Sequence, residues 1–192
     1  MVMRNTWLER AALDLDRLIL LLMLVIVAAI QTTAMFIQYA FQELPCPLCL
    51  LQRFALFGCC FGLIQQLRSG RREYGTGVSL IFALALLVIS VRQTLVDISP
   101  RPGHEYIGSA ILGIHMPVWS ILIAVALLLG LAVRLTLLGG SRSGPVCPGS
   151  SMYRLVEALF VYVVLLCAIN LVSVIVQCGA GECHTFGYRL LQ

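Results

Sequence analysis

The sequence contains little charge and no lysine. Only 11% of its 192 residues are charged and 60% are hydrophobic, whereas soluble domains have about 25% charged residues. This composition excludes an ordinary soluble domain. Internal repeats and low-complexity segments are also absent and the connections are short, which argues against a string of separate domains. We therefore predict a single membrane domain over residues 1–192.

Five apolar segments make up most of the chain. They cover residues 18–41, 51–67, 78–98, 118–138 and 155–177, and a membrane-spanning helix needs about 20 predominantly apolar residues. We predict an all-α integral membrane fold with five transmembrane helices. The first segment is too long for a removed signal peptide and lacks its small-residue cleavage site, so we expect a retained helix.

Arginine supplies all 13 basic residues, and its distribution predicts the orientation. Under the positive-inside rule, basic residues gather in the cytoplasmic connections. The N-terminus is thereby predicted to be cytoplasmic, and five spans then place the C-terminus outside. The predicted inner side carries Arg4, Arg10, Arg17, Arg68, Arg71, Arg72, Arg134, Arg142 and Arg154, and the outer side Arg53, Arg92, Arg101 and Arg189.

The eight cysteines divide according to this topology. Two close pairs, Cys46 with Cys49 and Cys178 with Cys183, fall on the outer side, where disulfides persist. Cys147 falls in an inner loop, and we expect a free thiol without function. The remaining three lie within helices, where buried cysteine usually packs as a small hydrophobe: Cys59, Cys60 and Cys167.

The first pair forms a Cys46-Pro47-Leu48-Cys49 motif, with Arg53 four residues later. Such a pair can close into a disulfide, and a guanidinium that keeps its proton favours a nearby thiolate. Two other interpretations are a stapling disulfide and half of a metal site. A tetrahedral zinc site needs two further ligands. We favour redox chemistry because Pro47 and Arg53 suit a redox loop.

The second pair closes the short ring Cys178-Gly179-Ala180-Gly181-Glu182-Cys183. The glycines allow the two α-carbons to approach within the about 7 Å that a disulfide requires. A structural staple is the alternative interpretation. We favour a redox pair, because His184 beside Cys183 could stabilise a thiolate and the short tail has little structure to staple.

Three further predictions concern polar and loop residues. Glu157 is expected near the inner surface, and Asn170 is expected to form an interhelical hydrogen bond rather than to act as a ligand. In the second outer loop, residues 99–117, apolar residues recur at helical spacing and predict a short surface helix: Tyr106, Ile107, Ala110, Ile111 and Ile114.

The run PCPLCLLQR followed by FALFG resembles the signature of disulfide bond formation protein B, the DsbB family of inner-membrane quinone reductases. Residues 91–93 (VRQ) and 112–119 (LGIHMPVW) are also similar to that family. The resemblance covers residues 12–138, with a connection, fifth helix and tail in residues 139–192. It implies a four-helix core, a bound ubiquinone or menaquinone, and a periplasmic DsbA-like thioredoxin-fold partner.

The resemblance also implies roles for individual residues. Cys49 would contact the quinone, Cys46 would be its partner, and Arg53 would orient and polarise the quinone oxygen. Gln52 and Arg92 would line the same pocket. A guanidinium that donates to an oxygen gaining negative charge favours the reduced product.

One feature departs from the family pattern, which keeps a second cysteine pair in the second outer loop. That loop has no cysteine here. We expect Cys178 and Cys183 to replace it, passing electrons from the partner to Cys46 and Cys49 and then to quinone in the bacterial inner membrane. The partner would be either a general or a dedicated thiol protein.

A metal-handling protein is an alternative of a different class. Copper or zinc would then be held by the outer thiolates and His184. A transporter is disfavoured because the predicted spans carry few charges.

Overall fold

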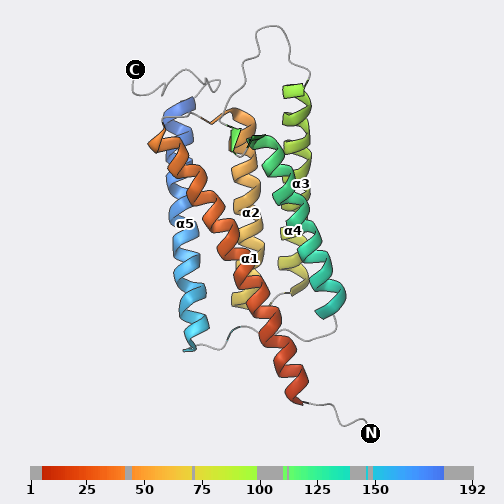
Figure 1. Cartoon of the computed structure of the whole chain (residues 1–192). Coiled ribbons are helices and arrows are strands. Elements are labelled where there is room, and N and C mark those ends of the chain that lie inside the picture. Colours follow the sequence, from red (N-terminus) through yellow and green to blue (C-terminus); the bar gives the residue numbers. More distant parts are fainter. Residues whose placement is uncertain are drawn as a thin grey trace.

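The computed structural model describes residues 6–41, 45–70, 72–98, 110–111, 113–138, 146 and 149–179. In these ranges the protein is a bundle of five long helices with one small hairpin (Figure 1). The helices are α1 (Thr6–Ala40), α2 (Pro47–Ser69), α3 (Arg72–Ile98), α4 (Met116–Leu138) and α5 (Ser151–Cys178).

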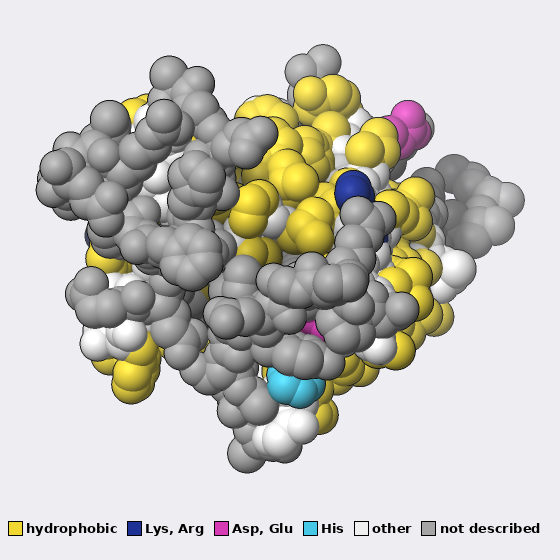
Figure 2. Space-filling model, turned by 90° about the horizontal axis from the view of Figure 1, so that it is seen from above, with side chains coloured by type: hydrophobic (Ala, Val, Ile, Leu, Met, Phe, Trp, Pro, Cys, Tyr) yellow, Lys and Arg dark blue, Asp and Glu magenta, His cyan; other side chains and the backbone are white. Residues whose placement is uncertain are grey.

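All five helices are long and apolar enough to cross a membrane, which confirms the predicted helical, multi-pass membrane architecture. Many large apolar side chains lie on the outside of the bundle, where lipid would cover them. Figure 2, which looks onto one end of the bundle, also shows mainly hydrophobic side chains among the described residues. The orientation relative to the cytoplasm stays a prediction from the arginine distribution.

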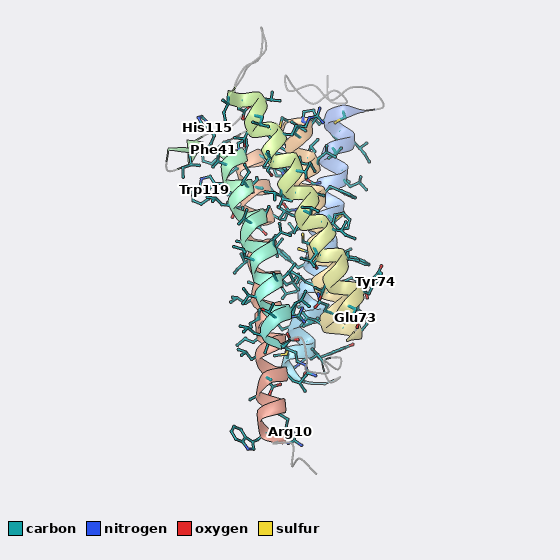
Figure 3. The ribbon with its side chains drawn as sticks, turned by 90° about the vertical axis from the view of Figure 1, so that its right-hand side faces the viewer. Arg10, Phe41, Glu73, Tyr74, His115 and Trp119 are labelled. Atoms are coloured by element: carbon teal, nitrogen blue, oxygen red, sulfur yellow. The ribbon has the colours of Figure 1, made fainter. Side chains whose placement is uncertain are left out.

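The central helix is α2, which contacts α1, α3 and α5, whereas α4 packs mainly on α3. Helix α2 begins at the same end of the bundle where α4 begins and where α3 and α5 end (Figures 1 and 3). We call this the thiol end, because Cys46 caps α2 there. The starts of α2 and α4 and the ends of α3 and α5 can therefore contribute residues to a site beside Cys46 and Cys49.

Two glycines let α2 and α3 approach closely. A Cβ at Gly62 would lie 2.6 Å from the carbonyl oxygen of Gly75, and one at Gly58 would overlap the Phe82 ring. Beside this contact, the Ser79 hydroxyl donates to the Cys59 carbonyl at 3.3 Å. Tight packing of α2 on α3 fixes the rotation of both helices, and with it the direction of side chains at the thiol end.

The cysteines predicted to pack within helices differ in their surroundings. Cys59 and Cys60 are buried in the core, as expected. Cys167 is exposed on α5, so the prediction of a packing role inside the bundle is wrong for that residue. Cys147 lies outside the described residues.

A buried polar cluster joins four helices at the opposite end of the bundle. Arg134 of α4 forms a bidentate ion pair with Asp16 of α1, at 2.6 and 3.0 Å. Its third donor group contacts Gln66 of α2 at 2.5 Å and Thr76 of α3 at 3.3 Å. The sequence predicts Arg134 among the arginines of the inner side, but its side chain is 2% exposed, because its partners lie inside the bundle.

Glu157 lies near the same end of the bundle and pairs with Arg68 at 2.8 Å, whereas its position near the inner surface stays a prediction. The Arg68 guanidinium also lies over the ring of Phe160, 4.3 Å from its centre. These contacts hold α5 against α2.

The prediction of a short surface helix within residues 99–117 is wrong for the residues that the structure describes there. Ala110–Ile111 (β1) pairs antiparallel with Ile114–His115 (β2), which leads directly into α4. Gly113 in the connection has φ 76°, a conformation that favours glycine and turns the chain back. Tyr106 and Ile107 lie outside the described residues.

Candidate redox site

The Cys46-x-x-Cys49 pair is formed by the first turn of α2. Cys46 is the N-cap residue, with extended backbone angles, and its sulfur accepts a hydrogen bond from the Cys49 backbone N–H at 3.2 Å. Pro47 occupies the start of the helix, where a missing N–H costs nothing. Local sequence therefore places Cys49 at the positive end of a helix dipole, which favours negative charge.

Cys46 and Cys49 are both free thiols, and they are not equivalent. The Cys46 side chain is 7% exposed, whereas Cys49 is partly exposed. The pKa of Cys46 is raised, mainly by its hydrogen bond with the Cys49 side chain and to a smaller extent by burial of the thiol. Cys46 therefore keeps its proton, and a negative charge on the reduced pair belongs to Cys49.

A chain of amide side chains reaches this pair from α3 and α2. The Gln93 side-chain nitrogen lies 3.5 Å from the sulfurs of both Cys46 and Cys49. Gln93 accepts a hydrogen bond from Gln52 at 2.9 Å, and Gln52 accepts one from Ser120 of α4 at 3.1 Å. Gln52 was predicted at the site, whereas Gln93 and Ser120 were missed.

The sequence predicts Arg92, and not its neighbour Gln93, as the cofactor-binding residue of the VRQ motif. Arg92 is exposed, whereas Gln93 is 6% exposed and faces the sulfurs. Successive helical residues point about 100° apart, so the inward-facing position depends on the rotation of α3. The sequence signal that could have identified Gln93 is an uncharged polar residue beside an arginine near the end of an apolar helix.

Arg53 lies one helical turn after Cys49, as the sequence predicted, and its side chain is buried. Its guanidinium donates to the Ala34 carbonyl at 3.0 Å and to the Gln38 side chain at 2.5 Å, both on α1. It also donates to the Asn170 side chain at 3.3 Å, which confirms Asn170 as an interhelical hydrogen-bond partner.

Helix α5 ends beside the Cys46 segment. The Gln177 side chain donates to the Pro45 carbonyl at 2.9 Å, and the next residue, Cys178, is buried and disulfide-bonded. This hydrogen bond therefore joins the two residues that directly precede Cys178 and Cys46 in the sequence. The predicted partner residues Cys183 and His184 lie outside the described residues.

The metal interpretation finds no support within the described ranges. They contain no group of three or more histidine, cysteine or acidic side chains placed to hold a metal ion. Cys46 and Cys49 do lie together, but the neighbouring side chain that donates to both sulfurs is Gln93, an amide. A site that includes Cys183 and His184 would extend beyond the described residues.

Comparisons with known proteins agree with the sequence resemblance. Residues 16–105, which contain Cys46, Cys49, Arg53 and Gln93, match the family model described as disulfide bond formation protein DsbB. No solved structure matches the chain.

Curated relatives carry the same description. Disulfide bond formation protein B of Cupriavidus metallidurans is 26% identical over 149 residues, covering 62% of this chain and 92% of that protein. The Nitrosomonas europaea protein of that name is 40% identical over 82 residues, or 40% of this chain and 49% of its own length. Disulfide bond formation protein B 1 of Pseudomonas putida is 37% identical over 83 residues, or 43% and 46%.

The relatives, the matching family model and the C-x-x-C motif at the start of a membrane-spanning helix agree: the chain is similar to the DsbB family of disulfide bond formation proteins, with the family model matching residues 16–105.

Proposed function

We propose that the protein is a disulfide-forming thiol oxidase that transfers electrons from a periplasmic DsbA-like dithiol protein to a membrane quinone. The similarity to the DsbB family supports disulfide formation. The dithiol at the positive end of α2, with a buried cation one turn away, supports redox chemistry at Cys46 and Cys49. The alternative of a copper or zinc protein has no comparable support among the described residues.

The observation that carries the proposal is the contact between α5 and the segment before Cys46. The Gln177 side chain donates to the Pro45 carbonyl at 2.9 Å. Cys178 follows Gln177 and Cys46 follows Pro45 in the sequence, so the two cysteines belong to segments that contact each other. Both cysteines are buried. We propose that Cys183 is the disulfide partner of Cys178, and that this tail pair replaces the cysteine pair expected in the second outer loop.

Electrons then pass through two thiol–disulfide exchanges. A partner thiolate attacks Cys183, and the partner's second thiol resolves the mixed disulfide, which leaves an oxidised partner and a reduced tail pair. The Cys178 thiolate next attacks Cys46 and releases Cys49 as a thiolate. Cys183 then attacks Cys178, so the tail disulfide re-forms and Cys46 leaves as a thiol. Two electrons and two protons have then reached Cys46 and Cys49.

The surroundings of Cys49 fit a quinone as the final acceptor. When bound, ubiquinone or menaquinone would take up two electrons and two protons. Leu51 and Phe54 are exposed apolar residues on α2 next to this turn, and they offer a lipid-soluble molecule a surface to approach. We propose that Arg53 and Gln52 hold its polar end, with the buried cation stabilising negative charge gained on reduction.

We propose that the thiol end lies on the outer side of the bacterial inner membrane. The arginine distribution supports this orientation, and disulfides persist on that side. A periplasmic thioredoxin-fold partner would meet the protein there. Arg92, which is exposed near this end, stays a predicted cofactor-binding residue.

The test follows quinone reduction optically by detergent-purified protein supplied with a reduced DsbA-like protein. We expect one quinone reduced for each donor dithiol oxidised. A double variant, Cys178→Ser with Cys183→Ser, should lose donor oxidation. The control Cys167→Ser, at an exposed cysteine of the same helix, should retain it. Normal donor oxidation by the double variant would overturn the relay, and no quinone reduction by the unmodified protein would overturn the oxidase.

A further inference from the structure

Gln93 stands out at the site because one side-chain nitrogen reaches two sulfurs. Its Nε2 lies 3.5 Å from Cys46 Sγ and 3.5 Å from Cys49 Sγ. The side chain is 6% exposed, so little water competes for these hydrogen bonds. Gln93 comes from α3, whereas both cysteines belong to the start of α2.

The neighbouring side chains fix which end of the Gln93 amide faces the sulfurs. The Gln52 Nε2 donates to Gln93 Oε1 at 2.9 Å, which leaves the Gln93 nitrogen directed at the sulfurs. The Ser120 hydroxyl in turn donates to Gln52 Oε1 at 3.1 Å. Each amide has a donor end and an acceptor end, so a flip of Gln93 would set its nitrogen against the Gln52 nitrogen, two donors facing each other. The amide chain is therefore oriented before any reaction occurs.

This arrangement matches what thiol–disulfide exchange requires. In each exchange, negative charge moves from the attacking sulfur to the leaving sulfur. A donor within reach of both sulfurs can stabilise the charge on either one without reorganising, as preorganised donors do in other reactions. Hydrogen bonds to charged groups are also stronger than those to neutral groups.

We infer that Gln93 is a catalytic residue that stabilises the thiolate of the reduced Cys46 and Cys49 pair, and that Gln52 and Ser120 are positioning residues that hold its amide in the donating orientation. The inference rests on the proposed function for the place of this pair in the electron relay. The contacts themselves do not depend on the partner or on the quinone. Stabilising the reduced pair makes the Cys46–Cys49 disulfide easier to reduce, and so a better oxidant of the tail.

The test measures the redox equilibrium of this pair alone. Full-length protein in detergent is equilibrated with mixtures of reduced and oxidised dithiothreitol, free thiols are alkylated, and the Cys46 and Cys49 peptide is quantified by mass spectrometry. In Gln93→Leu we expect the equilibrium constant for reduction of the disulfide to fall by about tenfold, because the reduced pair loses a hydrogen bond to a charged sulfur. Cys49 should also be alkylated more slowly.

Two further variants make the result specific. Gln52→Leu leaves Gln93 in place but removes the group that orients it, and we expect a shift in the same direction of about threefold. Thr94→Val is the matched control, because the Thr94 hydroxyl bonds only to the Ser90 carbonyl of its own helix among the contacts described. It should leave the equilibrium unchanged.

The outcomes separate this inference from the proposed function. An unchanged equilibrium in Gln93→Leu would overturn the catalytic role, and if that variant does not fold, an unchanged equilibrium in Gln52→Leu would overturn the oriented amide chain. If Thr94→Val shifted the equilibrium as much as Gln93→Leu, the shift would come from altered packing of α3, and the catalytic role of Gln93 would be overturned. Neither dithiothreitol nor alkylation involves the partner or a quinone, so failure of donor oxidation would leave these measurements valid.

Discussion

At the scale of single residues, the two cysteines of the first pair should differ in reactivity. The pKa of Cys46 is raised by its hydrogen bond with Cys49 and by burial, so this thiol stays protonated as the pH rises through the ordinary cysteine range. The thiolate is the nucleophile. Near neutral pH, iodoacetamide should therefore modify Cys49 at least about tenfold faster than Cys46 in the reduced protein.

Peptide mapping after timed alkylation measures this difference. Cys46 should approach the rate of Cys49 only in alkaline solution. Equal rates at neutral pH, in protein shown to be folded, would contradict the assignment of the negative charge to Cys49.

Individual residues also show what the sequence could predict. The C-x-x-C pair at the start of a helix follows from local signals, because a capping residue, a following proline and an apolar run act within a few positions. Gln93 and Arg92 could not be told apart in this way, since the tight packing of α2 on α3 decides which faces the sulfurs. Arg134 shows the same limit, because counting charges near helix ends does not reveal how deeply a side chain lies.

At the scale of elements, α5 is part of the candidate site as well as an anchor for the tail. Asn170 accepts a hydrogen bond from Arg53, and Gln177 binds the Pro45 carbonyl. The sequence predicted the helix and the cysteine at its end. It could not predict these contacts, because they depend on how α5 packs on α1 and α2.

Gln177→Leu tests the contribution of α5 to electron transfer. The variant loses the hydrogen bond to the Pro45 carbonyl, so the end of α5 is held less firmly beside Cys46. We expect transfer from the tail pair to Cys46 and Cys49 to slow by about tenfold, because positioning of reacting groups dominates such steps. Rapid-mixing experiments with a reduced donor, quenched by acid and analysed for the redox state of each pair, provide the rate.

The control for this variant is Ile175→Leu, at an exposed position of the same helix turn, which should behave as the unmodified protein. Direct reduction of Cys46 and Cys49 by dithiothreitol should be unchanged in both variants. A normal transfer rate in Gln177→Leu would mean that this contact does not position the relay.

At the scale of the whole molecule, the buried cluster around Arg134 joins α1, α2, α3 and α4. Removing one partner of a buried ion pair leaves an uncompensated charge and costs about 3–5 kcal/mol. Arg134→Met should therefore lower the midpoint of thermal unfolding in detergent strongly. Adding Asp16→Leu should restore much of the stability, because both charges are then absent.

Arg68→Met is the comparison for this prediction. The Arg68 and Glu157 side chains are 38% and 29% exposed, and ion pairs with such access to solvent contribute little to stability. Its effect should be much smaller than that of Arg134→Met. Equal effects would contradict a special role of the buried cluster.

The central claim for the molecule is that the tail pair at the end of α5 passes electrons to Cys46. A double variant, Cys49→Ala with Cys183→Ala, removes the thiols that would resolve the intermediate, so Cys178 and Cys46 should remain joined after mild oxidation with diamide. Non-reducing peptide mapping is the measurement. The account predicts a Cys46–Cys178 disulfide as the main product, whereas free Cys46 and Cys178, or Cys46 bonded to the exposed Cys167 instead, would contradict it.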